Sequence, residues 1–422
     1  MTGTTLSGRK YKAYPEYKES GVEWLPELPA NWKIERTKRM FSLKRCLVGN
    51  QSSNYQLLSL TLKGVIPRDI SSGEGKIPES FDTYQKVDEN DLIFCLFDID
   101  ETPRTIGISP LNGMITGAYN VYGCLEHCYS DYAYYYFFHI DSFKGLKPFY
   151  TGLRKVVRAE TFSNIEMPCP SFEEQQKIAS FLDHETAKID TLIAKQEKLI
   201  ELLKEKRQAV ISHAVTKGLN PNAPMRDSGV EWLGEVPEHW RVAKLSYFLK
   251  LLSGDGITSN QIEPVGKYPV MGGNGLRGYT TNYNCNGEYA LIGRQGALCG
   301  NVNIAKGKFF ASEHAVVVYP YLDFNLTFLS EFLRFMNLGQ YSVSAAQPGI
   351  SVERVNALKI AIPPLTEQTD IGDKIKVNTC RFDTLTSRAK TMIEVLKERK
   401  AALISAAVTG KIDVRDWKSQ GI

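Results

Sequence analysis

The sequence predicts an α+β protein in which two α/β domains are separated by two long helices that form an antiparallel coiled coil, with a pseudo-two-fold internal repeat. Three observations predict this fold class. An opening motif returns 208 residues further along the chain. Two long charged segments align with each other without a gap, and short β-branched and aromatic runs fill the stretches in front of them.

The opening motif is the first repeat. The segment SGVEWLPELPANW begins at Ser20, and SGVEWLGEVPEHW begins at Ser228. A chain of 422 residues exceeds what one hydrophobic core usually serves. A motif repeated at this distance therefore indicates two domains that start in the same way.

The second repeat is helical. PSFEEQQKIASFLDHETAKIDTL begins at Pro170, PPLTEQTDIGDKIKVNTCRFDTL begins at Pro363, and from Glu174 and Glu367 onward they align at a constant offset of 193 residues. Roughly 40 helical residues make a rod of about 60 Å, which is too long for a core helix. The a/d rhythm of a heptad predicts one helix-pairing seam in each rod: Ile189, Leu192, Leu199, Leu203 and Val210 in the first, and Phe382, Leu385, Met392, Leu396 and Leu403 in the second.

Two arrangements of these seams are open. The two rods pack on each other, which we expect because each seam then covers the other, or each seam docks against its own domain. Between the rods and the opening motifs lie runs such as NDLIFCLFDID and GEYALIGRQGALCGNVNIA, which are typical of short strands. The expected domain limits are 1–169 for the first domain, 170–217 for the first helical spacer, 218–362 for the second domain, 363–410 for the second spacer and 411–422 for a C-terminal tail.

Composition excludes several classes of protein. No apolar run reaches the roughly 18 residues of a membrane span, and the N-terminal segment lacks the apolar core of a signal peptide, so we expect a cytoplasmic protein. Eight scattered cysteines indicate reduced thiols. A net charge of +4 permits a nucleic-acid partner without requiring one.

Motifs for catalysis are missing from the sequence. There is no Walker A motif, no H-E-x-x-H, no G-x-S-x-G and no methyltransferase signature, so we expect a protein that is not an enzyme. The glycine-rich segments GGNGLRG and GRQGALCG are expected to be turns. A zinc site at Cys124, His127 and Cys128 would need a fourth ligand, and we expect none there. Glu313 and His314 are read as a structural pair rather than an acid/base pair.

The doubled order of opening motif, variable domain and P-x-x-E-Q helix resembles the specificity subunit of type I restriction-modification enzymes. The resemblance covers nearly the whole chain and includes the segments LIGRQGALCGNVNIAKGKFFASEHAVVV and GMITGAYNVY. It implies two target recognition domains, each reading one half of a bipartite site in double-stranded DNA, with the paired spacer helices setting the gap. It also implies two methyltransferase subunits and translocating endonuclease subunits as partners. S-adenosylmethionine, ATP and Mg²⁺ would belong to those partners and not to this chain.

Reading base edges requires forked donors and acceptors, such as Arg for guanine and Asn or Gln for adenine, whereas Lys and Arg on phosphates supply salt-sensitive affinity. On this basis the candidate DNA-binding residues are Lys63, Arg68, Arg104, Lys144, Lys147, Arg154, Lys155 and Arg158 in the first domain, and Asn274, Arg277, Arg294, Gln295, Gln347 and Arg354 in the second. The plain alternative for each of these residues is a solvated loop side chain.

Three other functions are compatible with the sequence. The first is a stand-alone two-module DNA-binding scaffold protein without an associated methyltransferase, which would bind a bipartite site unaided. The second is a fused methyltransferase, which the missing motifs disfavour. The third is a degenerate subunit that assembles with its partners and no longer reads DNA.

Overall fold

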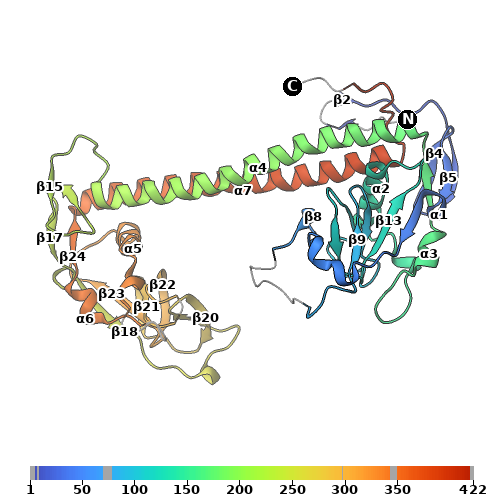
Figure 1. The fold of residues 1–422 in the computed structure, drawn as a ribbon. Helices are drawn as coiled ribbons and strands as arrows, with labels where there is room; N and C mark the ends of the chain where they lie inside the picture. The colour runs from blue at the N-terminus through green and yellow to red at the C-terminus, as the bar shows by residue number, and fades with distance from the viewer. Residues whose placement is uncertain (1–4, 7–8, 70–77, 297, 343–348, 419–422) are drawn as a thin grey trace. The chain divides into compact units, whose positions relative to one another are not determined.

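The computed structural model describes residues 5–6, 9–69, 78–296, 298–342 and 349–418. The chain divides into two compact units, of which the first consists of Met1–Gln196 and Thr391–Ile422 and the second of Glu197–Lys390. Both units contain helices and strands (Figure 1). Within the described residues, no helix combines the length and the hydropathy that crossing a membrane would require.

A four-stranded antiparallel sheet with the strand order β11-β10-β13-β6 lies in the first unit. Its strands are β6 (Phe41–Lys44), β10 (Leu92–Phe94), β11 (Ile106–Ile108) and β13 (Asn120–Cys124). Among the described residues, five strand pairs accompany it: β1 (Thr5–Leu6) with β2 (Arg9–Lys10), β3 (Tyr17–Val22) with β4 (Leu25–Pro29), β5 (Lys33–Arg36) with β14 (Glu166–Cys169), β7 (Leu58–Thr61) with β8 (Gly64–Pro67), and β9 (Gln85–Val87) with β12 (Gly113–Ile115). Short helices complete the unit: α1 (Thr37–Met40), α2 (Ser130–Ser142), α3 (Ala159–Ser163), η1 (Gly49–Asn54) and η2 (Lys147–Phe149).

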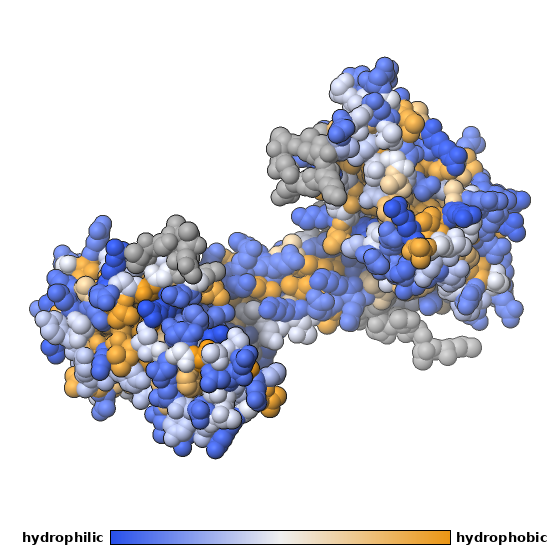
Figure 2. Space-filling view, turned by 90° about the horizontal axis from the view of Figure 1, so that it is seen from below, coloured by the Kyte–Doolittle hydropathy of each residue, from blue (hydrophilic) through white to orange (hydrophobic). Residues whose placement is uncertain are grey.

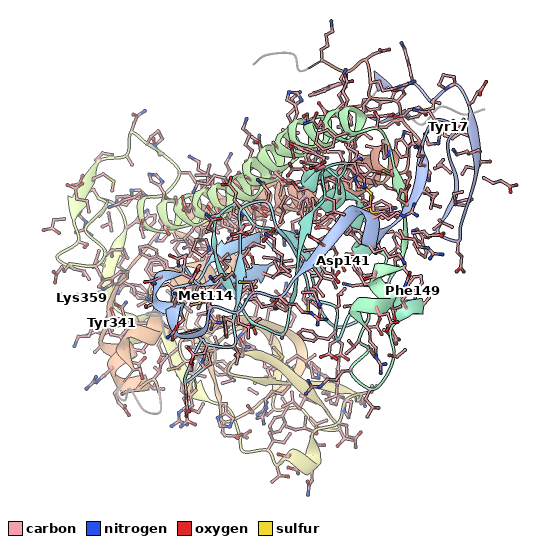
Figure 3. All side chains as sticks on the ribbon, turned by 45° about the vertical axis from the view of Figure 1, so that its right-hand side comes forward. Tyr17, Met114, Asp141, Phe149, Tyr341 and Lys359 are labelled. Atoms are coloured by element: carbon pink, nitrogen blue, oxygen red, sulfur yellow. The ribbon has the colours of Figure 1, made fainter. Side chains whose placement is uncertain are left out.

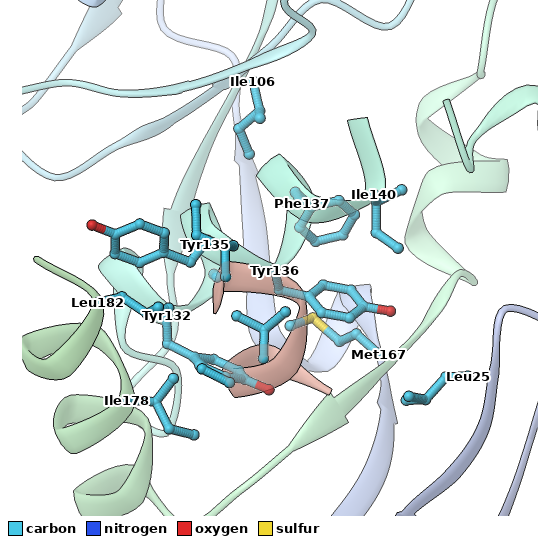
Figure 4. Close-up of a cluster of buried hydrophobic side chains, with 14 of the residues drawn as sticks. Leu25, Ile106, Tyr132, Tyr135, Tyr136, Phe137, Ile140, Met167, Ile178 and Leu182 are labelled. Atoms are coloured by element: carbon cyan, nitrogen blue, oxygen red, sulfur yellow. The ribbon is translucent and has the colours of Figure 1, made fainter. Parts of the chain in front are cut away.

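The aromatic helix α2 packs against the long helix α4 (Phe172–Lys217) in the core of the first unit (Figure 4). Tyr132 and Tyr136 of α2 are almost fully buried and belong to the same apolar cluster as Leu182 of α4. The Tyr132 hydroxyl donates a hydrogen bond to the Pro168 carbonyl at 3.1 Å. This bond allows the large ring to be buried without an unpaired polar atom.

The second unit contains a six-stranded sheet with the order β18-β23-β21-β22-β19-β20, in which only β19 and β22 run parallel. Its strands are β18 (Leu249–Ser253), β19 (Tyr268–Gly272), β20 (Gly275–Thr280), β21 (Cys285–Gly293), β22 (Val302–Ala311) and β23 (Ala315–Pro320). Two further pairs are β15 (Met225–Asp227) with β16 (Glu235–Pro237) and β17 (Arg241–Lys244) with β24 (Lys359–Ile362). The helices are α5 (Leu326–Phe335), α6 (Val352–Ala357), α7 (Leu365–Val408), η3 (Leu245–Tyr247), η4 (Ser259–Gln261) and η5 (Leu338–Tyr341).

The repeated tryptophans bind the repeated glutamates. In the first unit Glu174, at the start of α4, accepts hydrogen bonds from the indole of Trp32 at 3.0 Å and the hydroxyl of Tyr14 at 2.7 Å. In the second unit Glu367, at the start of α7, accepts a hydrogen bond from the indole of Trp240 at 3.2 Å. A buried indole N–H needs an acceptor. Each opening motif therefore holds the start of a long helix.

The repeated glutamines have matching roles. Gln175 accepts a hydrogen bond at 2.9 Å from the N–H of Tyr129, which caps α2, and Gln368 accepts one at 3.1 Å from the N–H of Asn325, which caps α5. The side-chain amide of each glutamine also donates to the carbonyl of the proline five residues before it, which is Pro170 in the first unit and Pro363 in the second. The segments 170–175 and 363–368 are repeated because each joins a long helix to its domain in the same way.

The helices α4 and α7 each contribute to both units and lie side by side within each one (Figure 1). In the first unit Lys400 of α7 pairs with Asp190 of α4 at 2.7 Å. In the second unit Arg207 of α4 pairs with Asp383 of α7 at 3.5 Å. The second ion pair lies at the repeat offset of 193 residues from the first, with the roles of the two helices exchanged.

Burial divides the predicted helix-pairing residues into two groups. Ile189, Leu396 and Leu403 are buried, and Leu203, Val210 and Phe382 are half-buried. The other four keep 37% to 48% of their surface exposed, which corrects their expected place in the seam: Leu192, Leu199, Leu385 and Met392. Three of these four precede an isoleucine that is more buried than they are: Ile193, Ile200 and Ile393. Because each such pair offers two adjacent apolar residues, the heptad pattern alone does not choose between them.

Candidate nucleic-acid interface

A shallow hollow in the second unit collects polar side chains from three loops and has a volume of about 490 Å³. The β19–β20 hairpin, the loop after β21 and the loop before β23 line it. Asn274, Arg277, Gln295 and His314 are among its lining residues. The first three are residues that the sequence predicts to contact DNA, and the fold brings them together at one place.

Glycines allow the tip of the β19–β20 hairpin to approach the neighbouring loops. A Cβ atom at Gly273 would lie 3.0 Å from the carbonyl oxygen of His314, and one at Gly293 would lie 2.5 Å from the carbonyl oxygen of Gly273. Gly275, which closes the turn, has a φ angle of +93°, where side chains are strained. The segment GGNG therefore positions the wall of the hollow as a tight turn.

The side chains of the hollow carry unused hydrogen-bonding groups. The Asn301 amide donates to Oδ1 of Asn274 at 2.9 Å, which orients Asn274. Within the described residues, no partner is found for the amide hydrogens of Asn274 or for the guanidinium of Arg277. Gln295 is exposed beside them. Such forked donors and acceptors can bind base edges in a major groove.

The other predicted residues of the second unit lie next to the hollow or beyond it. Arg294 is half-buried, and its backbone N–H donates to the His314 carbonyl at 2.9 Å while its carbonyl accepts from the Ile350 N–H at 2.9 Å. Arg354 is exposed on α6. Gln347 lies outside the described residues.

Three lysines of the basic run in the first unit are held in ion pairs. Asp100 pairs with Lys155 at 3.0 Å and with Lys147 at 3.2 Å. Hydrogen bonds from Lys155 and then Lys147 lower the pKa of the Asp100 carboxyl. Lys144 pairs with Asp141 of α2, which is labelled in Figure 3, at 2.7 Å. Asp100 and Asp141 therefore neutralise part of the positive charge of these three lysines.

The remaining predicted cations of the first unit differ in their solvent exposure and in their contacts. Arg154 and Arg158 are exposed and make no ion pair within the described part of the chain. Lys63 is exposed in the turn between β7 and β8. Arg68 follows β8, is half-buried, and its backbone N–H donates to the Leu57 carbonyl at 2.9 Å.

Arg104 has a clear internal role. Its guanidinium lies 4.7 Å from the centre of the Phe138 ring and donates to the Tyr134 hydroxyl at 3.2 Å. Both aromatic residues belong to α2. The structure thus places Arg104 against this helix, where it is half-buried and in contact with the unit's own side chains.

The second unit also contains a cluster of two lysines and two tyrosines that was not predicted from the sequence. Lys308 lies 4.8 Å above the ring of Tyr283, Lys267 lies 5.2 Å above the ring of Tyr268, and the two ring centres are 5.0 Å apart. These residues come from separate stretches and meet because β19 pairs in parallel with β22, with Val270 opposite Phe310. Sequence patterns give no signal for such a contact, because it depends on strand order.

The cysteine cluster of the first unit does not form a metal site within the described residues, where no group of three or more suitable ligands is found. Cys124 and Cys128 are free thiols. The hydrogen bond in which the Cys128 thiol donates to Cys124, followed by burial, raises the pKa of Cys128 far above the ordinary value. A raised pKa opposes the thiolate form that binds metals.

Known proteins similar to this chain include specificity subunits. The specificity subunit of the type I restriction enzyme EcoprrI from Escherichia coli is 42% identical over 147 residues, which are 34% of this chain and 36% of that protein. The specificity subunit of the type I restriction enzyme MjaVIII from Methanocaldococcus jannaschii is 24% identical over 296 residues, which are 63% of this chain and 66% of that protein. The chain matches less than two thirds of the length of either relative.

Solved structures share the fold. A chain from work on the structural basis of complex assembly and conformational transition of the type I R-M system aligns with a TM-score of 0.71 at 15% identity, over 91% of this chain and 99% of that chain. The HsdS subunit from Thermoanaerobacter tengcongensis aligns with a TM-score of 0.57 at 15% identity, over 91% and 98% of the two chains. At this identity the likeness concerns the fold alone.

The family described as type I restriction modification DNA specificity domain matches residues 119–202 and 237–394. The two matched segments include parts of both compact units. Because they make up more than half of the sequence, this chain belongs to the family of type I restriction-modification DNA specificity domains.

Proposed function

We propose that this protein is the DNA-recognition subunit of a type I restriction-modification complex, in which each unit reads one half of a bipartite DNA site. The observation that carries the proposal is the family match, which extends into both units. The structure supports it in a second way. The frame of each unit is repeated, including its Trp–Glu contact, whereas the exposed loops of the two units differ.

The candidate reading surfaces contain donors for which no partner is found in the part of the chain that the structure describes. In the second unit these are Asn274, Arg277 and Gln295 in the hollow, and in the first unit they are Arg154 and Arg158. We assign base reading to the hollow, because it holds amide and guanidinium groups together. The exposed cations among the other predicted residues would contact phosphates, a contact that positions the duplex without reading its sequence.

The two long helices are proposed to form an antiparallel coiled coil that sets the distance between the half-sites. The exchanged ion pairs Asp190–Lys400 and Arg207–Asp383 support this arrangement, as does the burial of Leu396 and Leu403. The proposed limits are 1–169 and 218–362 for the recognition domains, 170–217 and 363–410 for the spacers, and 411–422 for the tail.

Exposed apolar residues on the helices are the proposed docking surfaces for two methyltransferase subunits. Each unit carries an equivalent set, with 37% to 51% of each side chain exposed: Leu192, Met392 and Val395 in the first unit, and Leu199, Leu202 and Leu385 in the second. The sets are related by the repeat offset of 193 residues. Figure 2 shows hydrophobic residues among polar ones on the exposed surface of the helices. Two equivalent surfaces on one chain suit two copies of one partner.

The chemistry is proposed to belong to partner subunits. Methyltransferase subunits would bind S-adenosylmethionine, and translocating endonuclease subunits would bind ATP and Mg²⁺. This chain would then be a non-catalytic subunit that acts in the cytoplasm, where the DNA is. Relatives named as specificity subunits support this division.

Methylome sequencing tests the proposal. The chain is expressed with and without its cognate methyltransferase subunit in a host that lacks other adenine methyltransferases. We expect a methyladenine motif in two separated halves, present only when both proteins are made. A stable complex of the two proteins without any motif would reject DNA recognition and leave a degenerate subunit. A motif made by this chain alone would reject the division of labour.

A further inference from the structure

A tight hairpin in the first unit presents one apolar side chain to solvent. Leu153 has an exposed fraction of 103%, the highest of the large apolar residues that are exposed among the described ones. It follows Gly152, between η2 and α3, at the tip of a turn whose base is the bridge between Thr151 and Val156. A leucine in this position buries nothing within its own unit, which loses the free energy that its burial would contribute.

The hairpin is held rigidly. Thr151 and Val156 exchange two backbone hydrogen bonds at 3.0 and 3.1 Å, and the Lys155 N–H donates to the Gly152 carbonyl at 3.1 Å. Two further bonds tie it to the segment after β10, because the Asp98 N–H donates to the Arg154 carbonyl at 2.9 Å and the Val157 N–H donates to the Leu96 carbonyl at 2.8 Å. These hydrogen bonds within the unit therefore fix the backbone position of Leu153.

Cations flank this leucine in the sequence, and in the structure Asp100 and Glu101 pair with Lys155 beside it. From Phe143 to Arg158 the chain contains five cations and no acidic residue: Lys144, Lys147, Arg154, Lys155 and Arg158. Arg154, directly beside Leu153, and Arg158 have no ion-pair partner within the described residues. Lys147 and Lys155 are anchored through Asp100. A rigid apolar tip between cations fits an anionic partner with an apolar interior.

We propose that Leu153 is a wedge that enters the stack of base pairs in the DNA bound by the first unit, while Arg154 and Arg158 bind the adjoining phosphates. This inference rests on the proposed function and adds a means of recognition. Apolar wedges flanked by cations part a base step and kink the duplex. Flexible pyrimidine–purine steps open most readily, so the hairpin would select sequence through deformability, without a hydrogen bond to a base.

The test uses the complex of this chain with its cognate methyltransferase subunits and a duplex that carries the motif found by methylome sequencing. Leu153→Ala removes the proposed wedge, whereas Leu153→Phe replaces it with another large apolar side chain. Leu322→Ala is the matched control, because Leu322 is a leucine in the second unit with 66% of its surface exposed. DNA bending is measured by energy transfer between the duplex ends, and affinity is measured by fluorescence anisotropy.

We expect Leu153→Ala to weaken binding about 10-fold and to reduce the bend, whereas Leu153→Phe and Leu322→Ala keep both. A single mismatch moved across the half-site should restore the affinity of Leu153→Ala at one position, because a mismatch already weakens the stack there. This rescue separates a wedge from a residue that acts only through folding.

Two outcomes would overturn the inference while the proposed function stands. Leu153→Ala with unchanged affinity and bend would show that the tip does not enter the duplex. A loss of methyltransferase binding by Leu153→Ala with an unchanged bend would identify the tip as an anchor for a protein partner. If the unaltered complex neither binds nor methylates a specific site, the proposed function fails first and the wedge fails with it.

Discussion

Arg277 and His139 represent two kinds of exceptional side chain in this protein. Arg277 is exposed in a polar hollow, and no partner for its guanidinium is found within the described residues. His139 is a half-buried titratable group in a pocket that also contains Glu27 and Lys411. The first arrangement supports binding of a ligand with hydrogen-bonding edges. The second couples the stability of the first unit to pH.

Changing Arg277 tests base reading in the second unit. Arg277→Ala should reduce discrimination between the cognate site and a site altered in one half by about 1–3 kcal/mol, as expected for a lost bidentate contact to a base. Arg277→Lys keeps the charge but not the forked geometry, so it should lose discrimination and retain the salt dependence of binding. Competition binding by the complex at two salt concentrations measures both. Equal losses on both sites would mean that Arg277 contacts phosphate instead.

His139 should make the fold sensitive to mild acid. Burial, followed by the charge of Lys411, lowers the pKa of His139 to about 4, whereas an unfolded histidine has a pKa of about 6.5. Between these values the unfolded state binds more protons, so stability falls as the pH falls from about 6.5 towards 4. We expect His139→Gln to remove about 1–2 kcal/mol of the loss between pH 7 and pH 5. Urea denaturation at both pH values measures this, and equal pH dependence in the two proteins would contradict it.

The long helices show which structural features a periodic sequence pattern can predict and which it cannot. Periodicity predicts one apolar seam in each, and the structure has buried positions such as Ile189 and Leu403 in both helices. Four predicted seam residues are more exposed than expected, and next to three of them stands an apolar residue, such as Ile200 beside Leu199, that satisfies the heptad equally well. Packing decides between them, and the residue that stays outside becomes available to a partner.

The two classes of helix position predict opposite mutant phenotypes. Leu396 is 6% exposed, so Leu396→Glu buries an unpaired charge and should destabilise the chain by about 3 kcal/mol or more. Leu199 is 42% exposed, so Leu199→Glu should change stability by about 0.5 kcal/mol or less and prevent binding of a methyltransferase subunit. Chemical denaturation and size-exclusion chromatography with the partner separate the two effects. Intact assembly by Leu199→Glu would reject the docking surface.

The repeated Trp–Glu contacts predict a difference between the two units. Glu174→Ala leaves the indole of Trp32 and the hydroxyl of Tyr14 buried without their acceptor, at a cost of about 2–4 kcal/mol. Glu367→Ala should cost less, because one of its two donors is His239, whose side chain is 50% exposed. Hydrogen exchange of each unit in the full chain measures local stability. Equal losses of local stability in Glu174→Ala and Glu367→Ala would mean that the solvent exposure of the donors does not determine the energetic cost.

At the scale of the whole molecule, the proposed function predicts that each unit recognises its half-site independently of the other unit. Replacing residues 245–357 by the corresponding segment of another specificity subunit keeps the strands β17 and β24 and both long helices. We expect methylome sequencing to show a change in one half of the bipartite motif, with the other half and the gap unchanged. A changed gap would mean that the recognition domains, and not the helices, set the distance.

The sequence by itself determined the duplicated frame, the mixed α/β composition and the family, because these depend on repeated motifs and on periodicity along the chain. It also named Asn274, Arg277 and Gln295, since forked polar residues in glycine-rich loops have a recognisable chemistry. Only the tertiary structure decided that these three share a hollow, that Arg104 packs against α2 and that Asp100 holds two lysines of the basic run. Those facts depend on which distant segments touch, and such contacts follow from strand order and packing rather than from any local pattern.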